Sequence, residues 1–311
     1  MIKMYRLLLP ALLVAVISLV ATPVSSQGGV TLYGVAYEHY GQDLGGGPAT
    51  LYTIDIATGA ATPVGPIGFN MVGGIDYDFR AGVLCGISNL LGEGGEGLFL
   101  TIDPATGAGA EVGPTVGAQD ISFRPSDSRL YAFSDGHLGT INTLTGEPTH
   151  IGDTGYFGAG NGIAFSPVNI LYLAHSPYYP EDPPPTLYIL NQNTGARTFV
   201  TDLIFPPDLT RPRINAMDFH PSTGVLYASL NTAGDLTNYL ATVDITTGNV
   251  AIIGRTVDGL DAIAFYIQHR PVAGVIVPVN KLEVLAPYVA LAGLVAAVTI
   301  VTVKIRSRKP E

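Results

Sequence analysis

One phrase recurs five times along this chain and restricts its possible folds more than any other feature. It reads LYTIDIATGAATPVG at 51–65 and LFLTIDPATGAGAEVG at 98–113, and weaker copies follow at 140–152, 187–200 and 240–254. The Thr-Gly glycines of successive copies are 48, 39, 49 and 53 residues apart. This period fits a four-stranded propeller blade with variable loops and is too long for a leucine-rich repeat. These five glycines are Gly59, Gly107, Gly146, Gly195 and Gly248.

Each repeat unit divides into four expected strands. An apolar stretch ending in an aromatic residue opens the unit, and a tight turn rich in Pro, Ser, Asn and Gly separates it from a second apolar stretch. The Leu-Tyr-x-Ile-Asp element and the Val-Gly element are the third and fourth strands. The five opening strands are expected at 73–77, 119–123, 161–165, 215–219 and 261–265.

The two ends of the repeat region complement each other. Residues 30–37 read as a second strand with no opening strand before them, whereas residues 260–266 read as an opening strand with nothing after them. Together they complete one blade, and a ring closed in this way leaves no sheet edge exposed. We therefore predict an all-β fold, a five-bladed β-propeller with 1+3 velcro closure, over residues 27–269.

The Asp-x-x-Thr-Gly segment of each copy predicts a turn. An aspartate such as Asp55 can accept bonds from the turn N–H groups, and the glycine adopts a φ that a side chain would resist. Asn142 and Asn191 replace the aspartate in the third and fourth copies. Since the position requires an oxygen and no charge, we expect these residues to be structural rather than catalytic or metal-binding.

The repeated Leu-Tyr-x-Ile-Asp-x-x-Thr-Gly and Val-Gly pattern carries a family resemblance. It resembles the blades of secreted and surface β-propeller repeat proteins of bacteria and archaea, the YVTN and quinoprotein-like propellers. The resemblance covers Val30 to Tyr266. It implies a blade type and a surface location, but no single function, because propellers include lectins, glycosidases, scaffolds and quinoproteins.

Both chain ends carry signals for export and anchoring. Lys3 and Arg6 precede an apolar run and a short segment of small residues, which is the layout of a secretory signal peptide. Near the other end, an uncharged run of 20 residues is long enough to span a bilayer, and basic residues follow it. We predict a signal peptide at 1–26, an extracellular propeller at 27–269, a linker at 270–283, a single transmembrane helix at 284–303 and a cytoplasmic tail at 304–311.

The predicted propeller is strongly acidic. Between Gln27 and His269 the chain has seven Arg, no Lys and 23 Asp or Glu residues. Such a surface repels phosphate backbones, so we expect no nucleic acid partner. Cys85, the only cysteine, can form no internal disulfide and is expected to be a small buried residue.

One face of the ring is expected to carry the function. Turns between the first and second strands, and between the third and fourth, are short, whereas connections on the opposite face are long and uneven. Variable loops on a rigid scaffold commonly carry binding residues. The segments of this long-loop face are 34–50, 65–73, 87–97, 152–160, 174–186, 201–213 and 229–239.

Aromatic and imidazole side chains are frequent in these segments. They suit contacts with sugar rings or with a protein surface, although they also suit packing over the core beneath the loops. The candidate ligand-binding residues are Tyr37, His39, Tyr40, Phe69, Tyr156, Phe157, His175, Tyr178 and Tyr179.

A second candidate site is the ring of polar residues at the start of the opening strands, expected at the mouth of the central channel. Such an oxygen-rich, cysteine-free set suits ordered water or, as an alternative, a hard cation such as calcium. We predict no other metal and no cofactor. The channel-mouth residues are Gln119, Asp120, Asn161, Asn215 and Asp261.

A catalytic alternative rests on carboxylates. Five-bladed glycosidases place separated carboxylates at the channel mouth, so Asp76, Asp120, Asp218 and Asp261 are conceivable acids and bases. Asp76 and Asp218, however, occupy positions that hold serine or alanine in other blades, which favours packing between blades. We therefore predict a non-enzymatic binding module for a glycan or another surface protein. A glycoside hydrolase and a structural surface-layer component without a small ligand remain the alternatives.

Overall fold

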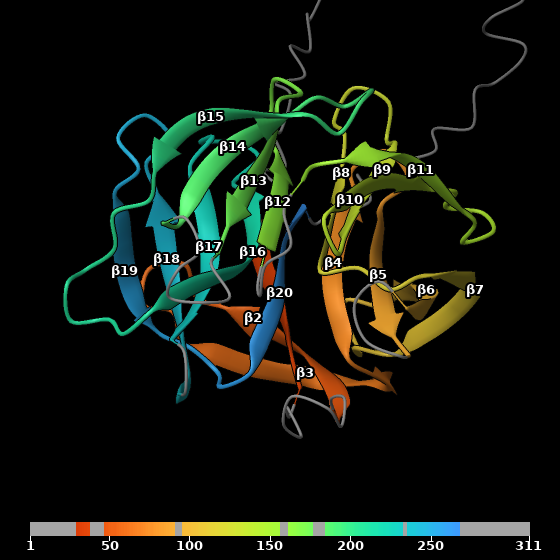
Figure 1. The fold of residues 1–311 in the computed structure, drawn as a ribbon. Coiled ribbons are helices and arrows are strands. Elements are labelled where there is room, and N and C mark those ends of the chain that lie inside the picture. The colour runs from red at the N-terminus through yellow and green to blue at the C-terminus, as the bar shows by residue number, and fades with distance from the viewer. Residues whose placement is uncertain are drawn as a thin grey trace, which may run out of the picture. The chain divides into compact units, whose positions relative to one another are not determined.

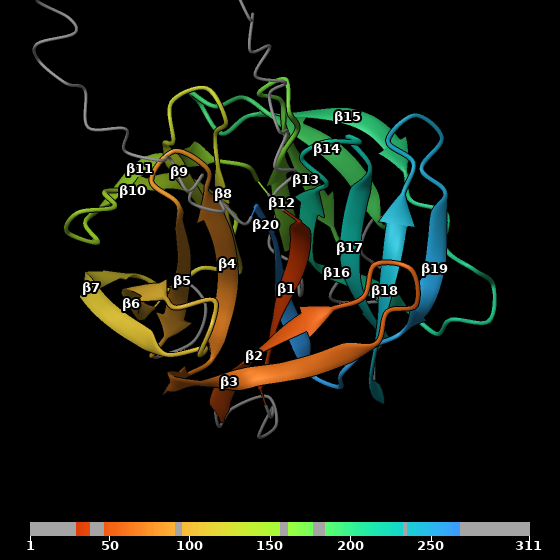
Figure 2. The same ribbon diagram turned by 180° about the vertical axis from the view of Figure 1, so that it is seen from behind.

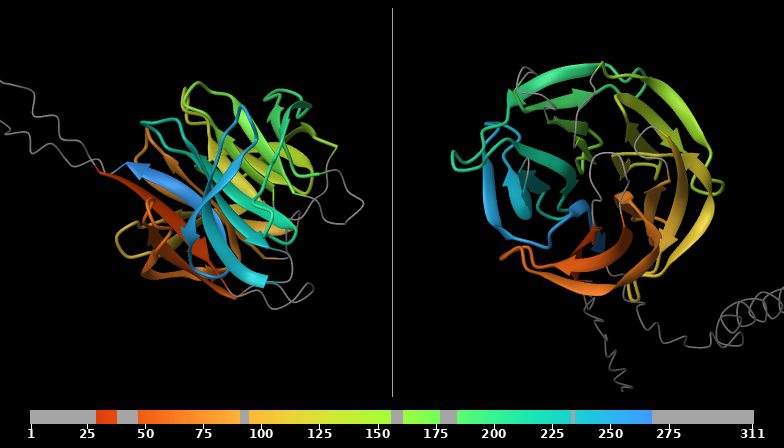
Figure 3. Two further views of the ribbon diagram at one scale, coloured as in Figure 1. Left: turned by 90° about the vertical axis from the view of Figure 1, so that its left-hand side faces the viewer. Right: turned by 60° about the horizontal axis from the view of Figure 1, so that its bottom comes forward.

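The regular structure of the protein consists of β-strands throughout the residues that the computed structural model describes, 29–37, 47–90, 95–155, 161–176, 184–232 and 235–267. Five antiparallel sheets of four strands surround a common axis (Figures 1 and 3). The predicted all-β class and the five-bladed propeller are confirmed. The predicted signal peptide, linker, transmembrane helix and tail lie outside the described residues, among which no helix could cross a membrane.

The blades are numbered in chain order, and each is given from its innermost strand outward. Blade 1 contains β20 (Leu260–Ile267), β1 (Val30–Ala36), β2 (Pro48–Ile54) and β3 (Ala61–Asn70). Blade 2 contains β4 (Val72–Asp78), β5 (Val83–Asn89), β6 (Glu96–Ile102) and β7 (Gly109–Val116). Blade 3 contains β8 (Asp120–Phe123), β9 (Leu130–Ser134), β10 (His137–Ile141) and β11 (Pro148–Asp153).

Blade 4 contains β12 (Asn161–Phe165), β13 (Leu171–His175), β14 (Thr186–Leu190) and β15 (Arg197–Asp202). Blade 5 contains β16 (Pro212–Phe219), β17 (Leu226–Thr232), β18 (Asp235–Val243) and β19 (Val250–Arg255). The inner strands are the five apolar stretches expected to open the repeat units. They contact one another around the axis in the order β4, β8, β12, β16, β20 and back to β4.

Strands from the two ends of the described domain share one sheet. β1 pairs antiparallel with β20, from Val30 opposite Ile267 to Ala36 opposite Leu260 (Figure 2). Each of these strands has a hydrophobic side chain such as Leu32 or Ile263 buried in the same apolar cluster. The sheet therefore joins the first and last described strands by backbone pairs along the whole of β1, with one irregularity between Val35 and Ala36.

The apolar core lies between neighbouring blades. One cluster combines Tyr33 and Leu51 of blade 1 with Ile75 and Leu84 of blade 2. Another packs Cys85 with side chains of blades 2 and 3, and the predicted burial of this cysteine is confirmed. Each fully buried aliphatic side chain contributes about 1.5–3 kcal/mol relative to an exposed one. Blade-to-blade packing is therefore a principal source of stability.

The repeated Asp-x-x-Thr-Gly segments form the expected turns. Asp55 accepts hydrogen bonds through Oδ1 from the backbone N–H groups of Ala57 (2.8 Å) and Thr58 (3.1 Å). In the third copy, Asn142 Oδ1 accepts the same type of bond from Leu144 N (2.9 Å). The five turn glycines have φ between 73° and 80°. A side-chain amide and a carboxylate thus accept the same turn hydrogen bond, as the exchange of Asp for Asn between repeats indicated.

The same turns also connect the blades. The carbonyl oxygen of Thr106 in blade 2 lies against Gly65 of β3 so closely that a Cβ on this glycine would collide with it. Gly254 of β19 meets Thr58 of blade 1 in the same way. Gly113 and Gly152 make the equivalent contacts with the following blade. The Val-Gly element of one blade is therefore the docking position for the Thr-Gly turn of the next.

The long-loop face is less extensive than predicted. β3 continues to Asn70, and only Met71 separates it from β4, so the expected loop at 65–73 is wrong. The Gly and Pro residues of this segment belong to an outermost strand. A proline there removes no hydrogen bond of the sheet where its nitrogen faces solvent. The expected loop at 229–239 is also wrong, because Asn231 pairs with Asn238 and extends the β17–β18 hairpin.

Candidate functional site

Five backbone N–H groups near the axis require acceptors. Each belongs to the aromatic residue near the end of an inner strand, and the inner strand has no further strand of its own sheet on the axial side. Because buried N–H groups without an acceptor are costly, side chains have to satisfy them. The five groups are those of Tyr77, Phe123, Phe165, Phe219 and Phe265.

Asp76 and Ser122 satisfy three of these groups. Asp76 Oδ1 accepts a bond from Tyr77 N (2.7 Å), and its Oδ2 accepts one from Phe123 N of the next blade (2.5 Å). Ser122 Oγ accepts a bond from Phe165 N of the blade that follows (3.0 Å). Each side chain thus links its own inner strand to the next.

Asp218 satisfies the other two groups. Its Oδ2 accepts a bond from Phe265 N (2.6 Å), and the carboxylate also accepts one from Phe219 N. Ala164 and Ala264 occupy the equivalent positions in blades 4 and 1. No acceptor is needed at these two alanines. In the blade that follows each of them, Asp218 or Asp76 already accepts the bond from the N–H group of the next residue in its own strand. The pattern Asp, Ser, Ala, Asp, Ala around the ring therefore matches the number of N–H groups.

Asp120 reaches farther across the axis. Its Oδ1 accepts a bond from Ile121 N (2.9 Å), and its Oδ2 accepts bonds from Ile163 N of blade 4 (2.9 Å) and Met217 N of blade 5 (3.4 Å). The side chain is fully buried. This candidate channel-mouth residue thus joins three blades at the centre of the ring.

The three buried aspartates have unusual acidity. Burial raises the pKa of Asp76 to about 7, although its backbone hydrogen bonds act in the opposite direction. Burial also raises the pKa of Asp120 and of Asp218 well above the usual range, and the nearby Asp76 adds to both shifts. The cause is the cost of a charge in a low-dielectric interior. These groups can therefore hold protons at pH values where exposed carboxylates are ionised.

Two predicted channel-mouth amides bond to the backbone of adjacent strands. Gln119 Oε1 accepts a bond from Asp135 N (3.3 Å), and Asn161 Oδ1 accepts one from Ser176 N (3.3 Å). Both amide side chains are buried. Their contacts order the ends of β9 and β13, which favours a structural role for these two residues.

Of the other two channel-mouth residues, Asp261 belongs to β20 and Asn215 of β16 contacts that strand. Asn215 Nδ2 donates to Leu260 O (3.5 Å), and the Tyr37 hydroxyl donates a short hydrogen bond to Asp261 Oδ2. Tyr37 follows β1, so the structure brings together one residue from each of the two predicted sites. Because Asp261 is only partly buried, this pair is the most accessible polar contact among the described candidates.

The remaining described candidates differ in position. His175 ends β13 and is buried, with 1% exposure. Phe69 belongs to β3 rather than to a loop, and its half-buried ring lies beside Gly109 of blade 2. The prediction that Phe69 is a loop residue is therefore wrong. The candidates outside the described residues are His39, Tyr40, Tyr156, Phe157, Tyr178 and Tyr179.

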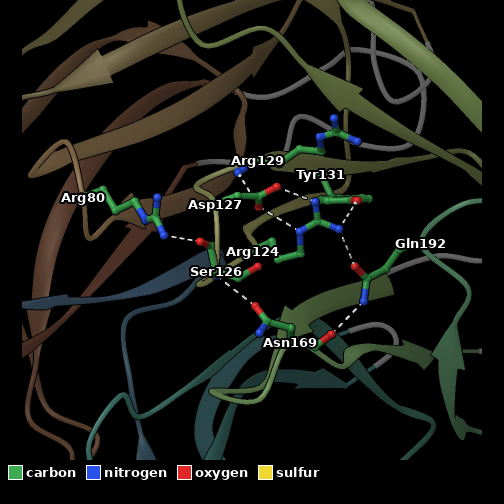
Figure 4. Close-up of polar contacts among 8 residues, drawn as sticks. All are labelled: Arg80, Arg124, Ser126, Asp127, Arg129, Tyr131, Asn169 and Gln192. Atoms are coloured by element: carbon green, nitrogen blue, oxygen red, sulfur yellow. Dashed lines mark hydrogen bonds and ion pairs between the residues drawn. The ribbon is translucent and has the colours of Figure 1, made fainter.

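The opposite, short-turn face carries a polar network around Arg124 (Figure 4). The guanidinium group donates from Nε to Asp127 (2.8 Å) and from one terminal nitrogen to both the Tyr131 hydroxyl (3.0 Å) and Gln192 Oε1 (2.8 Å). It also lies 5.5 Å from the centre of the Tyr131 ring. The hydrogen bond from Arg124 lowers the pKa of Asp127 to about 2.

This network joins turns of three blades. Arg80 of blade 2 donates to Ser126 O, and Ser126 N donates to Asn169 Oδ1 of blade 4 (2.9 Å). Gln192 Nε2 donates to the carbonyl oxygen of Asn169 (2.7 Å). The turns of the short-turn face are therefore held by contacts within the protein.

One group of side chains was missed at the sequence level. His137, His150 and Asp153 lie together on β10 and β11, and their nearest nitrogen and oxygen atoms are within 4.8 Å of one another. Two of the six histidines of the chain within one hairpin were the available signal. Their convergence depends on strand register, which the sequence pattern did not reveal.

Comparisons with known proteins identify no family. No model of a known protein family matches the chain, and no curated protein matches it. A solved chain of a nidogen/laminin complex is similar over 76% of this chain and 98% of its own, with 11% identity and a TM-score of 0.48. A putative 6-phosphogluconolactonase from Bacteroides fragilis matches over 78% and 99%, with 10% identity and a TM-score of 0.43. A protein of unknown function from Bacteroides thetaiotaomicron matches over 71% and 57%, with 16% identity and a TM-score of 0.44.

Proposed function

We propose that the protein is a cell-surface binding module that engages its ligand through the long-loop face. The contrast between the two faces carries this proposal. All five turns between third and fourth strands have six residues, and neighbouring blades pack against them. On the other face, β1 and β2 are separated by residues 37–47 and β13 and β14 by residues 176–185. Connections of unequal length on a rigid ring are typical of binding surfaces.

The chemistry of these connections favours a sugar or protein ligand. Their sequences contain Tyr40, Tyr178 and Tyr179, and the Tyr37 hydroxyl bonds to Asp261 at the same face. Tyrosine offers an apolar ring and a polar hydroxyl, which suits both pyranose rings and protein surfaces. We take a glycan as the first ligand class and a surface protein as the second. The acidic surface argues against nucleic acid.

The location of the protein is part of the same proposal. The signal-like segment at 1–26 and the apolar segment at 284–303 support export and a single-pass anchor, with the propeller outside and the C-terminus inside. The resemblance to secreted and surface propeller repeat proteins supports the same location. Protease treatment of intact cells should digest the propeller and spare an epitope placed after Glu311. Protection of the propeller would contradict this topology.

A glycan array probed with the full chain in detergent tests the binding function. We expect saturable binding that the double substitution Tyr178→Ala and Tyr179→Ala reduces by tenfold or more, since each lost aromatic contact costs about 1 kcal/mol or more. Phe199→Ala is the matched control, because Phe199 is an exposed aromatic residue on the outer strand β15. Equal loss in the control, or binding that the double variant retains, would contradict the role of this face.

The raised pKa of Asp76 favours glycoside hydrolysis as the second candidate function. Shifted carboxyl groups are common at catalytic sites, and a raised pKa suits a general acid. Against this function, Asp76, Asp120 and Asp218 are buried and bond to backbone N–H groups. Release of sugar from glycoside substrates that Asp261→Asn abolishes would favour the hydrolase. Absence of sugar release together with self-association would favour a structural surface-layer role.

A further inference from the structure

The β10–β11 hairpin of blade 3 gathers three side chains of types that commonly serve as metal ligands, His137, His150 and Asp153. His137 Nδ1 lies 2.7 Å from Asp153 Oδ1, and His150 Nε2 lies 3.4 Å from the same oxygen. The two imidazole rings meet edge to face, with centres 5.5 Å apart. All three side chains are about half exposed or more. An ion could therefore reach them from solvent without any opening of the propeller.

A β-bulge brings the three groups to one side of the sheet. His137 pairs directly with Asp153, whereas His150 pairs with Gly139, because the register shifts between Leu138 and Gly139. In a regular strand, residues 150 and 153 would point to opposite faces. The extra residue of the bulge changes this alternation, so both side chains reach the face of His137.

The equivalent positions exist in every blade, but only blade 3 fills all three with metal-binding groups. The same register shift recurs in the outer strand pairs of the other four blades. The sets equivalent to His137, His150 and Asp153 are Thr50, Pro63 and Pro66 in blade 1; Leu98, Glu111 and Pro114 in blade 2; Thr186, Phe199 and Asp202 in blade 4; and Tyr239, Ile252 and Arg255 in blade 5.

A pocket lies beside this cluster. It has a volume of about 380 Å³, and both His137 and His150 line it. Gly139 and Ala132, which face each other across β10 and β9, also line it. At the position of Gly139, blades 1, 2 and 4 hold the larger residues Tyr52, Leu100 and Tyr188, and blade 5 holds Ala241. Gly139 is the smallest of the five and leaves room for this hollow.

We propose that His137, His150 and Asp153 form a binding site for a divalent transition-metal ion, with zinc as the best fit. Two imidazoles and one carboxylate are common zinc ligands, and bonds of about 2.0–2.1 Å in a tetrahedral site place ligand atoms about 3.3 Å apart. The separation of 3.4 Å between His150 Nε2 and Asp153 Oδ1 matches this spacing. His137 Nδ1 and Asp153 Oδ1 lie at hydrogen-bond distance, 2.7 Å, without metal, so these two atoms have to move about 0.6 Å apart to share the ion.

The fourth coordination position remains for water or a small donor ligand in the adjacent pocket. Zinc sites with three protein ligands keep such an open position. Asp135 also lines the pocket, and its carboxylate adds negative charge that favours a cation. Calcium is not expected to bind here, because it requires six to eight oxygen ligands.

Calorimetric titration of the full chain, prepared without a histidine tag, with Zn²⁺ tests this site. We expect saturable binding of one ion per chain and no comparable heat with Ca²⁺. His150→Ala and Asp153→Asn should each weaken zinc binding by roughly tenfold or more. Since both side chains are exposed, circular dichroism spectra and melting temperatures without metal should match those of the unmodified chain.

Asp202→Asn is the matched control. Asp202 occupies the position of Asp153 in blade 4, opposite Thr186, and its substitution should leave zinc binding unchanged. The absence of saturable zinc binding would overturn the proposal, as would binding that survives His150→Ala and Asp153→Asn. An equal loss in the Asp202→Asn variant would overturn it too, because the effect would then follow surface charge and not this cluster.

Discussion

At the residue scale, a few side chains near the axis have roles that follow from counting hydrogen bonds. Asp76 and Asp218 each serve two N–H groups, Ser122 serves one, and the alanines serve none. Comparison of the five repeats with one another predicted packing between blades at these positions. It did not reveal the bonds, because the partners of Asp76 and Ser122 lie in the following blade.

The raised pKa of Asp76 predicts a stability that falls as pH rises. The folded state retains its proton up to pH about 7, whereas the unfolded state loses it near pH 4, so ionisation opposes folding increasingly between these values. We expect the free energy of unfolding to be about 2–3 kcal/mol lower at pH 8 than at pH 5 from this group alone. Urea unfolding at both pH values measures it.

The variant Asp76→Asn separates the ionisation of Asp76 from other causes of pH-dependent stability. The amide cannot ionise, so the difference between pH 5 and pH 8 should shrink, although the single amide oxygen leaves Tyr77 N or Phe123 N less well bonded. Asp55→Asn, in an exposed turn where other copies carry asparagine, should leave the pH difference unchanged. An undiminished pH difference in Asp76→Asn would contradict the assigned pKa.

Cys85 should be unreactive in the folded protein. It is buried in the cluster between blades 2 and 3, and burial raises the pKa of its thiol to about 12. Since the thiolate is the reactive form, Ellman's reagent at pH 8 should label less than a tenth of the chain within minutes. In 6 M guanidinium chloride one thiol per chain should react. Rapid labelling without denaturant would show that this core opens.

At the element scale, the repeated phrase has two structural functions. Its Asp-x-x-Thr-Gly segment closes the turn between the third and fourth strands, and its Val-Gly element receives the turn of the neighbouring blade. Blade 4 departs from the pattern, and there Ile204 N donates to Gly248 O (2.9 Å) and joins blades 4 and 5 through the backbone. The first function was predicted from the sequence, whereas the second requires a neighbour that only the ring supplies.

Gly254→Ala tests the contact between blades. A Cβ at this position would collide with the carbonyl oxygen of Thr58 in blade 1, so we expect a loss of about 1–3 kcal/mol in the free energy of unfolding. Gly29→Ala is the control, because the space around Gly29 is open and its φ is ordinary. Denaturant unfolding of both variants measures the effect. Equal stabilities would show that the turn moves aside at no cost.

At the scale of the whole molecule, the five blades depend on the ring. Inner strands contact neighbours on both sides, and blade 1 combines β20 with β1, β2 and β3. Without β20, β1 would present an unpaired edge, which is prone to association with other chains. The two faces of the ring also differ: the six-residue turns of one face pack between blades, whereas the connections of the other face are unequal in length.

Truncation at two positions tests this dependence. A chain ending at residue 259 lacks β20 and should aggregate or unfold without a cooperative transition, whereas a chain ending at residue 269 retains β20 and should unfold cooperatively. Size-exclusion chromatography and thermal unfolding, monitored by circular dichroism, compare the two. If both behave alike, pairing of β20 with β1 is not required for the fold.

The functional surfaces were only partly predictable. Tyr37 and Asp261 were assigned to different candidate sites, and the pairing of β1 with β20 brings them into one hydrogen bond. Phe69 was expected in the connection at 65–73, but it lies in β3, an outermost strand that accepts the glycine and proline residues around it. The group of His137, His150 and Asp153 escaped notice because a bulge, not their spacing, places them on one face.

The sequence by itself determined the blade type, the number of blades and the turn chemistry, because these depend on contacts within a few residues and on a period repeated five times. Only the tertiary structure decided which side chains meet across blades: Asp76 with Phe123, Gly254 with Thr58, Tyr37 with Asp261. These contacts join residues that are 47 to 224 positions apart in the chain. The physical reason is that local propensity sets the strand and the turn, whereas register and ring geometry set what each side chain touches.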